Sequence, residues 1–165
     1  MLKIITTLSL FLIGMLAKGQ EAELSSFSKV EVKNGIEVIY TESKIPSLRV
    51  EAENVSVLKN LITEVKGKTL KIYLLKKEDQ TALENTIKVY LSAQNVSSFD
   101  VHSNSKISVM NQITSENLNI DLKSKGQFSG TIICNGKTKL VANSGTIFNG
   151  RVETISFVGN FKNNS

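Results

Sequence analysis

The feature that most constrains the fold of this chain is a sequence repeat between residues 99 and 150. Phe128 and Phe148 lie 20 residues apart (148 − 128), and Phe99 and Ile120 lie 21 apart (120 − 99). A fixed period of about twenty residues with alternating apolar positions is typical of stacked rungs. We therefore expect an all-β protein with a right-handed parallel β-helix-like stack of ~20-residue rungs, preceded by β-strands and hairpins.

Residues at equivalent positions of the repeat should stack inside such a coil. Neighbouring rungs lie about 4.8 Å apart, so equivalent side chains would touch directly. Small residues such as Ser105 and Gly126, between two apolar pairs, would let each rung turn a corner. The alternative architecture is an antiparallel β-sandwich. The three predicted ladders are Phe99/Ile120/Leu140, Val101/Leu122/Ala142 and Ile107/Phe128/Phe148.

Residues 1–19 are predicted to be a secretory signal peptide. Lys3 precedes an apolar run over residues 4–16, and the small residues Ala17 and Gly19 favour cleavage between Gly19 and Gln20. The run is short for a membrane span, which needs about 20 residues. We expect one domain over residues 27–165, exported to the periplasm, the cell surface or the medium, with no stable membrane span after cleavage.

The residues before the repeat form short β-type segments. Segments 30–32 and 36–40 alternate in polarity and flank Asn34-Gly35, a pair that supplies the positive φ angles of a type I′ turn, so a hairpin is predicted. Segment 54–66 is ambiguous, because its apolar residues have helical spacing but parts of it could equally be strand. It supports a single helical turn at most.

Composition narrows the possible functions. Cys134 is the only cysteine, which excludes an intramolecular disulfide, and its apolar neighbours favour burial over reactivity. Loss of the signal peptide lowers the net charge from +5 to +3 (18 basic minus 15 acidic residues). The basic residues are scattered and no tryptophan is present, so nucleic acid is not an expected partner. No cofactor is expected.

Asp100 and Asp121 are the strongest candidates for chemistry. They share one position in the repeat and should point outward, away from the Phe99/Ile120 ladder. Two carboxylates could serve glycosidic cleavage or begin a calcium site, which needs six or more oxygens. The next rung has Val141 at this position, so the site would stop after two residues.

The neighbouring His102 and Lys123 would partly balance the two carboxylates. We interpret Asp100, His102, Asp121 and Lys123 as a speculative surface site on a solvated face. His102 is the only histidine, and no G-x-S-x-G elbow is present. No catalytic or metal-binding residue is therefore assigned.

Five segments, in their order and spacing, resemble the bacterial family called putative auto-transporter adhesin, head GIN domain (DUF2807). The resemblance covers about residues 27–160 and implies an exported β-helical protein, of a kind common in Bacteroidota, with no established biochemical activity. The rungs depart from the Ser-Gly-Ser-Gly steps typical of the family, and they are fewer than usual. The segments are residues 27–40, 48–52, 65–72, 87–91 and 96–103.

The favoured function is that of an exported, non-enzymatic surface or envelope protein, adhesin-like or glycan-contacting. Its expected partner is a cell-surface glycan or protein. The alternative is a carbohydrate-active β-helix enzyme that uses Asp100 and Asp121. The final rung predicts a homo-oligomer, because an open strand edge favours pairing with another chain.

Overall fold

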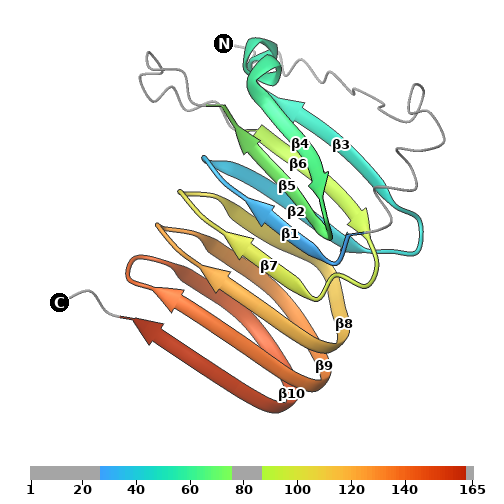
Figure 1. Ribbon diagram of the computed structural model, residues 1–165, viewed down its shortest axis with the longest axis vertical. Coiled ribbons are helices and arrows are strands. Elements are labelled where there is room, and N and C mark those ends of the chain that lie inside the picture. The colour runs from blue at the N-terminus through green and yellow to red at the C-terminus, as the bar shows by residue number, and fades with distance from the viewer. Residues whose placement is uncertain (1–26, 76–86, 163–165) are drawn as a thin grey trace, which may run out of the picture.

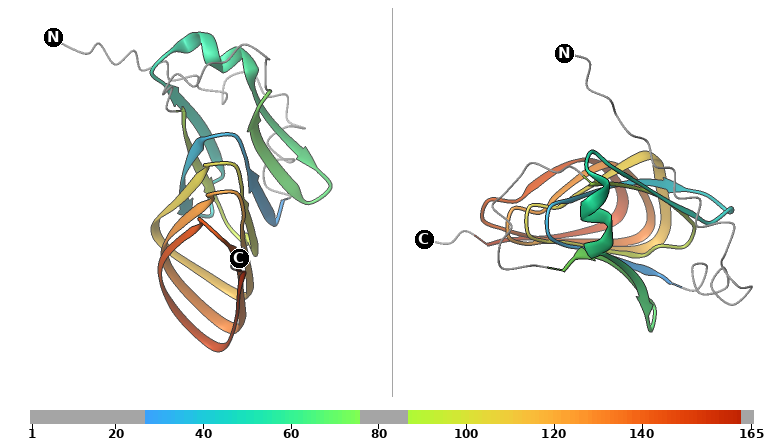
Figure 2. Two further views of the ribbon diagram at one scale, coloured as in Figure 1. Left: turned by 90° about the vertical axis from the view of Figure 1, so that its left-hand side faces the viewer. Right: turned by 90° about the horizontal axis from the view of Figure 1, so that it is seen from above.

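The computed structural model describes residues 27–75 and 87–162, which form an all-β fold. All the strands belong to one ten-stranded sheet that curls round a shared core (Figures 1 and 2). The predicted signal peptide lies outside the described residues. The elements are β1 (Lys29–Val32), β2 (Ile36–Glu42), β3 (Ser47–Ala52), the 3₁₀ helix η1 (Val55–Asn60), β4 (Leu61–Lys66), β5 (Thr69–Leu74), β6 (Ile87–Ala93), β7 (Ser98–Val101), β8 (Lys106–Leu122), β9 (Gln127–Asn143) and β10 (Ile147–Lys162).

The sheet has two walls that face each other across the core. One wall contains β4, β5, β1 and β7, and the other contains β3, β6 and β2 (Figure 1). Strand β8 joins them, because its beginning pairs with β2 and its end pairs with β7, both in parallel. Strands β9 and β10 follow the same curved path in parallel register. The long strands therefore contribute to both walls.

The registers confirm the three predicted ladders. Phe99 pairs with Ile120, and Ile120 pairs with Leu140. The members of the other two ladders are paired in the same way, each with the spacing read from the sequence. Phe128 and Phe148 are register partners with parallel rings 5.8 Å apart. Phe128 also contacts Phe99 across the core, with ring centroids 5.5 Å apart, and Phe99 contacts Tyr40 at 5.2 Å. The core thus contains a continuous aromatic column.

The predicted hairpin between residues 30–32 and 36–40 is wrong. Strand β1 pairs in parallel with β5 and β7, and β2 pairs in parallel with β6 and β8. The turn geometry was predicted correctly, since Asn34 and Gly35 have φ angles of 67° and 77°. The chain turns a corner there, because the backbone groups of both strands bond to rungs above and below. Asn34-Gly35 determines the local bend of the backbone, whereas the partners of β1 and β2 are determined by the strands that lie beside them.

The corners themselves stack on one another. The Gly35 amide donates to the Ser103 carbonyl at 2.9 Å, and the Asn104 amide donates to the Ser124 carbonyl at 3.0 Å. Ser103, Asn104 and Ser124 all have positive φ angles, like Asn34 and Gly35. The corners at residues 34–35, 103–104 and 124–125 therefore turn with the same left-handed backbone.

Small residues next to the corners are required by close approach. A Cβ at Gly126 would lie 2.1 Å from the Val101 carbonyl oxygen. In the preceding rung, Ser105 is fully buried and accepts a bond from the Ile36 amide at 3.3 Å. This confirms the prediction that the Ser105/Gly126 position must stay small.

The ambiguous segment forms η1 followed directly by β4, so it contains both a short helix and a strand. The six residues of η1 exceed the single helical turn predicted, because a 3₁₀ helix has about three residues per turn. Helix η1 lies at the end of the stack opposite β10 (Figure 1), where it buries Val57. Cys134 is buried, and its thiol donates to the Glu116 carbonyl at 3.2 Å.

Replacing Phe128 should destabilise the fold strongly. Its ring is 1 % exposed and packs between two other rings, so Phe128→Ala should cost about 3–5 kcal/mol. Urea unfolding measures this cost. Ile45→Ala, at a residue that is 78 % exposed, is the control and should change stability by less than about 0.5 kcal/mol. Equal costs for the two variants would contradict the aromatic column.

Candidate functional site

The outward side of the β5–β1–β7–β8 wall carries a band of charged side chains, here called the charged face. It arises because side chains alternate along each strand. In β1, Val30 and Val32 point inward, whereas Lys29 and Glu31 point outward. Parallel register then aligns outward residues of successive rungs in rows. The charged face consists of Lys29, Glu31, Lys33, Lys71, Asp100, His102, Asp121 and Lys123.

Asp100 and Asp121 are register partners, as their spacing predicted. Each has its own lysine: Lys29 Nζ lies 2.5 Å from Asp100 Oδ2, and Lys123 Nζ lies 2.5 Å from Asp121 Oδ2. The register partner of Asp121 in the next strand is Val141, so no third carboxylate follows in that direction. The two carboxylates are therefore individually ion-paired.

Sequence reasoning missed the role of Lys29. It predicted that His102 and Lys123 would balance the carboxylates, whereas Asp100 is paired with a lysine about 70 residues away in sequence (100 − 29). The contact exists because β1 lies beside β7, with Lys29 opposite Ser98. Nothing in the local sequence signals this pairing, because it depends on the order of strands in the sheet.

The other two residues of the predicted surface site lie beside the acidic pair. Partial burial lowers the pKa of His102 and outweighs the nearby charge of Asp100, so the imidazole is neutral at neutral pH. The hydrogen bond to Asp121 raises the pKa of Lys123, which stays charged. The structure thus brings Asp100, His102, Asp121 and Lys123 together on one face.

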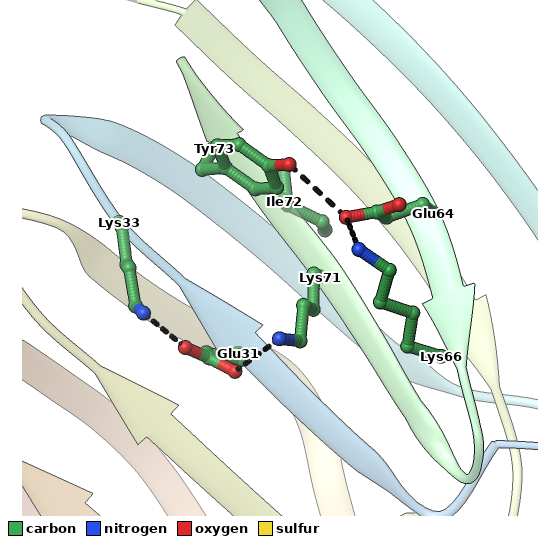
Figure 3. A pocket seen from close by; sticks show the side chains of 7 residues that line it. All are labelled: Glu31, Lys33, Glu64, Lys66, Lys71, Ile72 and Tyr73. Carbon is green, nitrogen blue, oxygen red and sulfur yellow. Dashed lines mark hydrogen bonds and ion pairs between the residues drawn. The ribbon is translucent and has the colours of Figure 1, made fainter. Parts of the chain in front are cut away.

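A shallow hollow of about 150 Å³ lies at one end of the charged face, where β4, β5 and β1 meet (Figure 3). Glu31 lines the hollow and is bound by Lys33, with Lys71 Nζ at 3.9 Å. Burial alone would raise the pKa of Glu31, but the hydrogen bond and charge of Lys33, with the charge of Lys71, hold it below its ordinary value.

The rim of the hollow contains a second set of paired groups. Glu64 accepts a hydrogen bond from the Tyr73 hydroxyl at 3.0 Å and lies 3.2 Å from Lys66 Nζ. The hydrogen bonds from Lys66 and Tyr73 lower the pKa of Glu64, and the hydrogen bond to Glu64 raises the pKa of Tyr73. Sequence reasoning treated these charges as scattered, because their convergence requires the antiparallel β4–β5 pair to lie beside β1.

The opposite wall is also ion-paired on its outer side. Arg49 lies 4.0 Å from the Tyr90 ring centroid and is bound to Glu51, which accepts from the Tyr90 hydroxyl at 3.0 Å. Lys106 Nζ lies 3.4 Å from Glu37. Both outer surfaces therefore present alternating donors and acceptors.

The outer surface of the described part of the chain carries ion-paired side chains. Residues 27–75 and 87–162 include no group of three or more His, Cys, Asp or Glu side chains placed to hold a metal ion. Among these same residues, no helix is long and apolar enough to cross a membrane. The charged face can donate and accept hydrogen bonds over a broad, shallow area.

The Glu31 contacts make part of the stability pH-dependent. A carboxylate whose pKa is lowered in the folded state stabilises the fold above its ordinary pKa, and this stabilisation is lost as the pH falls through the folded value. Wild type should thus exceed Glu31→Gln in stability at pH 7, and the difference should shrink below about pH 4. Urea unfolding across pH measures it. In a Lys33→Ala background the difference should be smaller, and a pH-independent difference would contradict the assignment.

The comparisons with known proteins agree with this architecture. A search of curated proteins gives no match. A "putative lipid binding protein" of Parabacteroides distasonis is 18 % identical, with a TM-score of 0.58 over 84 % of this chain and 70 % of that one. A "putative adhesin" of Parabacteroides merdae is 9 % identical, with a TM-score of 0.50 over 85 % and 92 %. The family model for "Putative auto-transporter adhesin, head GIN domain" matches residues 26–161, and the chain belongs to this family.

Proposed function

We propose that this protein is an exported, non-enzymatic surface or envelope protein that acts by adhesin-like binding through its charged face. Family membership supports the adhesin-like role. The physical observation that carries the proposal is the hollow beside Glu31, where donors and acceptors from three strands converge in an open, shallow surface. Such a surface suits a ligand that is broad and polar.

A glycan is the ligand class that best fits this hollow. Sugar hydroxyls both donate and accept hydrogen bonds, and the hollow offers lysine ammonium donors beside the carboxylate acceptors of Glu31 and Glu64. Surface ion pairs contribute little to stability, so they can rearrange round a ligand at small cost. The Tyr73 ring adds an apolar body with a polar tip.

The similar structure from P. distasonis is described as a lipid binding protein, whereas the charged face of this chain is suited to a polar ligand. An acyl chain requires a mostly apolar concave site, and six of the seven residues that line the hollow are charged or aromatic with a polar group. We therefore favour the glycan over a lipid at this site.

We also infer that the curled sheet is a right-handed parallel β-helix with incomplete rungs. The parallel registers of β7, β8, β9 and β10 support this inference, as do the stacked corners. In such a coil the outward rows form flat, rigid surfaces, which suit repeated contacts with an extended polymer.

The carbohydrate-active alternative depends on Asp100 and Asp121. Glycosidic cleavage requires one carboxyl group that carries a proton and a second that is ionised. Each of these carboxylates is instead held by a lysine, Asp100 by Lys29 and Asp121 by Lys123. The arrangement therefore supports binding better than acid–base catalysis.

Glycan-array binding by the exported chain tests the proposal. Lys33→Ala with Lys66→Ala removes two donors from the hollow and should weaken binding about tenfold or more, equivalent to about 1.4 kcal/mol. Lys106→Ala, on the opposite wall, is the matched control and should leave binding unchanged.

Three results would contradict the proposal. They are the absence of binding to any glycan, equal losses in the hollow and control variants, and cleavage of a glycan that Asp100→Asn or Asp121→Asn abolishes. The last result would establish the enzyme alternative.

A further inference from the structure

The last strand of the stack exposes residues of a kind that the preceding rungs bury. Phe161 is the register partner of Ala142, yet it is 64 % exposed, whereas Ala142 is 7 % exposed. Phe157, the register partner of the buried Thr138, is 47 % exposed. Strand β10 pairs with β9 along one edge, and within residues 27–75 and 87–162 no strand pairs with its other edge. We call this surface of β10 the end face (Figure 1).

Aromatic rings cover much of the end face. The rings of Phe157 and Phe161 lie over Gly159, where a Cβ would come within 2.7 Å of Phe161 and 3.0 Å of Phe157. The Phe148 ring lies in the same way over Gly150. A cavity of about 480 Å³ beside these rings reaches down to Leu140 and Ala142. The end face is therefore an apolar surface continuous with the core.

The end face also has polar requirements that an apolar ligand cannot meet. The free edge of β10 presents backbone N–H and C=O groups along 16 residues. An acyl chain could cover the phenylalanine rings but would leave these groups without partners, whereas an added strand both pairs with them and buries the rings. The occupant that fits is therefore a β-strand.

We propose that this strand is β10 of a second copy, which pairs edge to edge and antiparallel about a two-fold axis. In this arrangement, charged residues of one β10 lie opposite residues of the other charge in the second β10. Arg151 and Glu153 flank Val152, are exposed, and lie 2.6 Å apart through their side-chain atoms. Antiparallel pairing centred on Val152 places Arg151 opposite the partner's Glu153, and Glu153 opposite the partner's Arg151.

The opposite end of the stack favours closure at two copies. There η1 covers the core and buries Val57, and the nearby edge strands β3 and β4 have only six residues each. A contact that uses the same end face on both copies is isologous, so it closes as a dimer and does not extend into a filament. The dimer would display two charged faces, which goes beyond the binding role proposed above.

Charge reversal tests the arrangement in the full chain, produced with its own N-terminal segment. Light scattering after size exclusion should give a dimer for wild type. Arg151→Glu and Glu153→Arg should each weaken dimerisation about tenfold or more, since each places like charges opposite one another at two symmetric positions. An equimolar mixture of the two variants should restore the dimer, and so should the double exchange in one chain.

Lys44→Glu is the control, because Lys44 is an exposed residue between β2 and β3, outside the end face. It should leave the dimer intact, and circular dichroism should show that every variant is folded. A monomeric wild type would overturn the proposal and assign the end face to a strand of another protein or an apolar ligand. A dimer that the single reversals leave unchanged would also overturn it.

Discussion

Parallel backbone pairing at an offset close to twenty residues is the constraint on which the rest of this structure depends. From β7 onward, paired residues of neighbouring strands lie 19 to 21 residues apart, as Phe99 with Ile120 and Phe128 with Phe148. The offset changes by one or two residues at irregularities within β8 and β10. This spacing places like positions above one another, which builds the aromatic column inside. It also explains the corners, where left-handed residues recur at the same point of each rung.

The same register organises the outer surface. Alternation along each strand means that every buried ladder has an outward row beside it, so charges distant in sequence come together, as Lys29 and Asp100 do. The charged face thus follows from the packing of the core, and its charged side chains are ion-paired and accessible to solvent. The binding role proposed for the charged face would use the side chains of the strands, whereas the pairing proposed for the end face would use a backbone edge.

Much of the core could be predicted from the sequence, whereas the strand order could not. Apolar repetition marks Ile107 and Phe128 as stacking partners, because burial acts on every rung in the same way. Asn34-Gly35 specified its own backbone bend but not the partners of the strands beside it, so a corner was mistaken for a hairpin. The hollow at Glu31 was missed for the same reason, since its residues meet only through the placement of β4 and β5 beside β1.

Disulfide trapping between β8 and β9 tests this parallel register most directly. Ser108 and Ser129 are register partners with hydroxyl oxygens 3.4 Å apart, a placement compatible with a disulfide. In a Cys134→Ala background, Ser108→Cys with Ser129→Cys should cross-link within one chain on mild oxidation, as judged by mass and gel mobility. Ser108→Cys with Thr131→Cys, two residues out of register, should cross-link far less. Equal trapping of both pairs, or trapping only of the second, would contradict the stacked register.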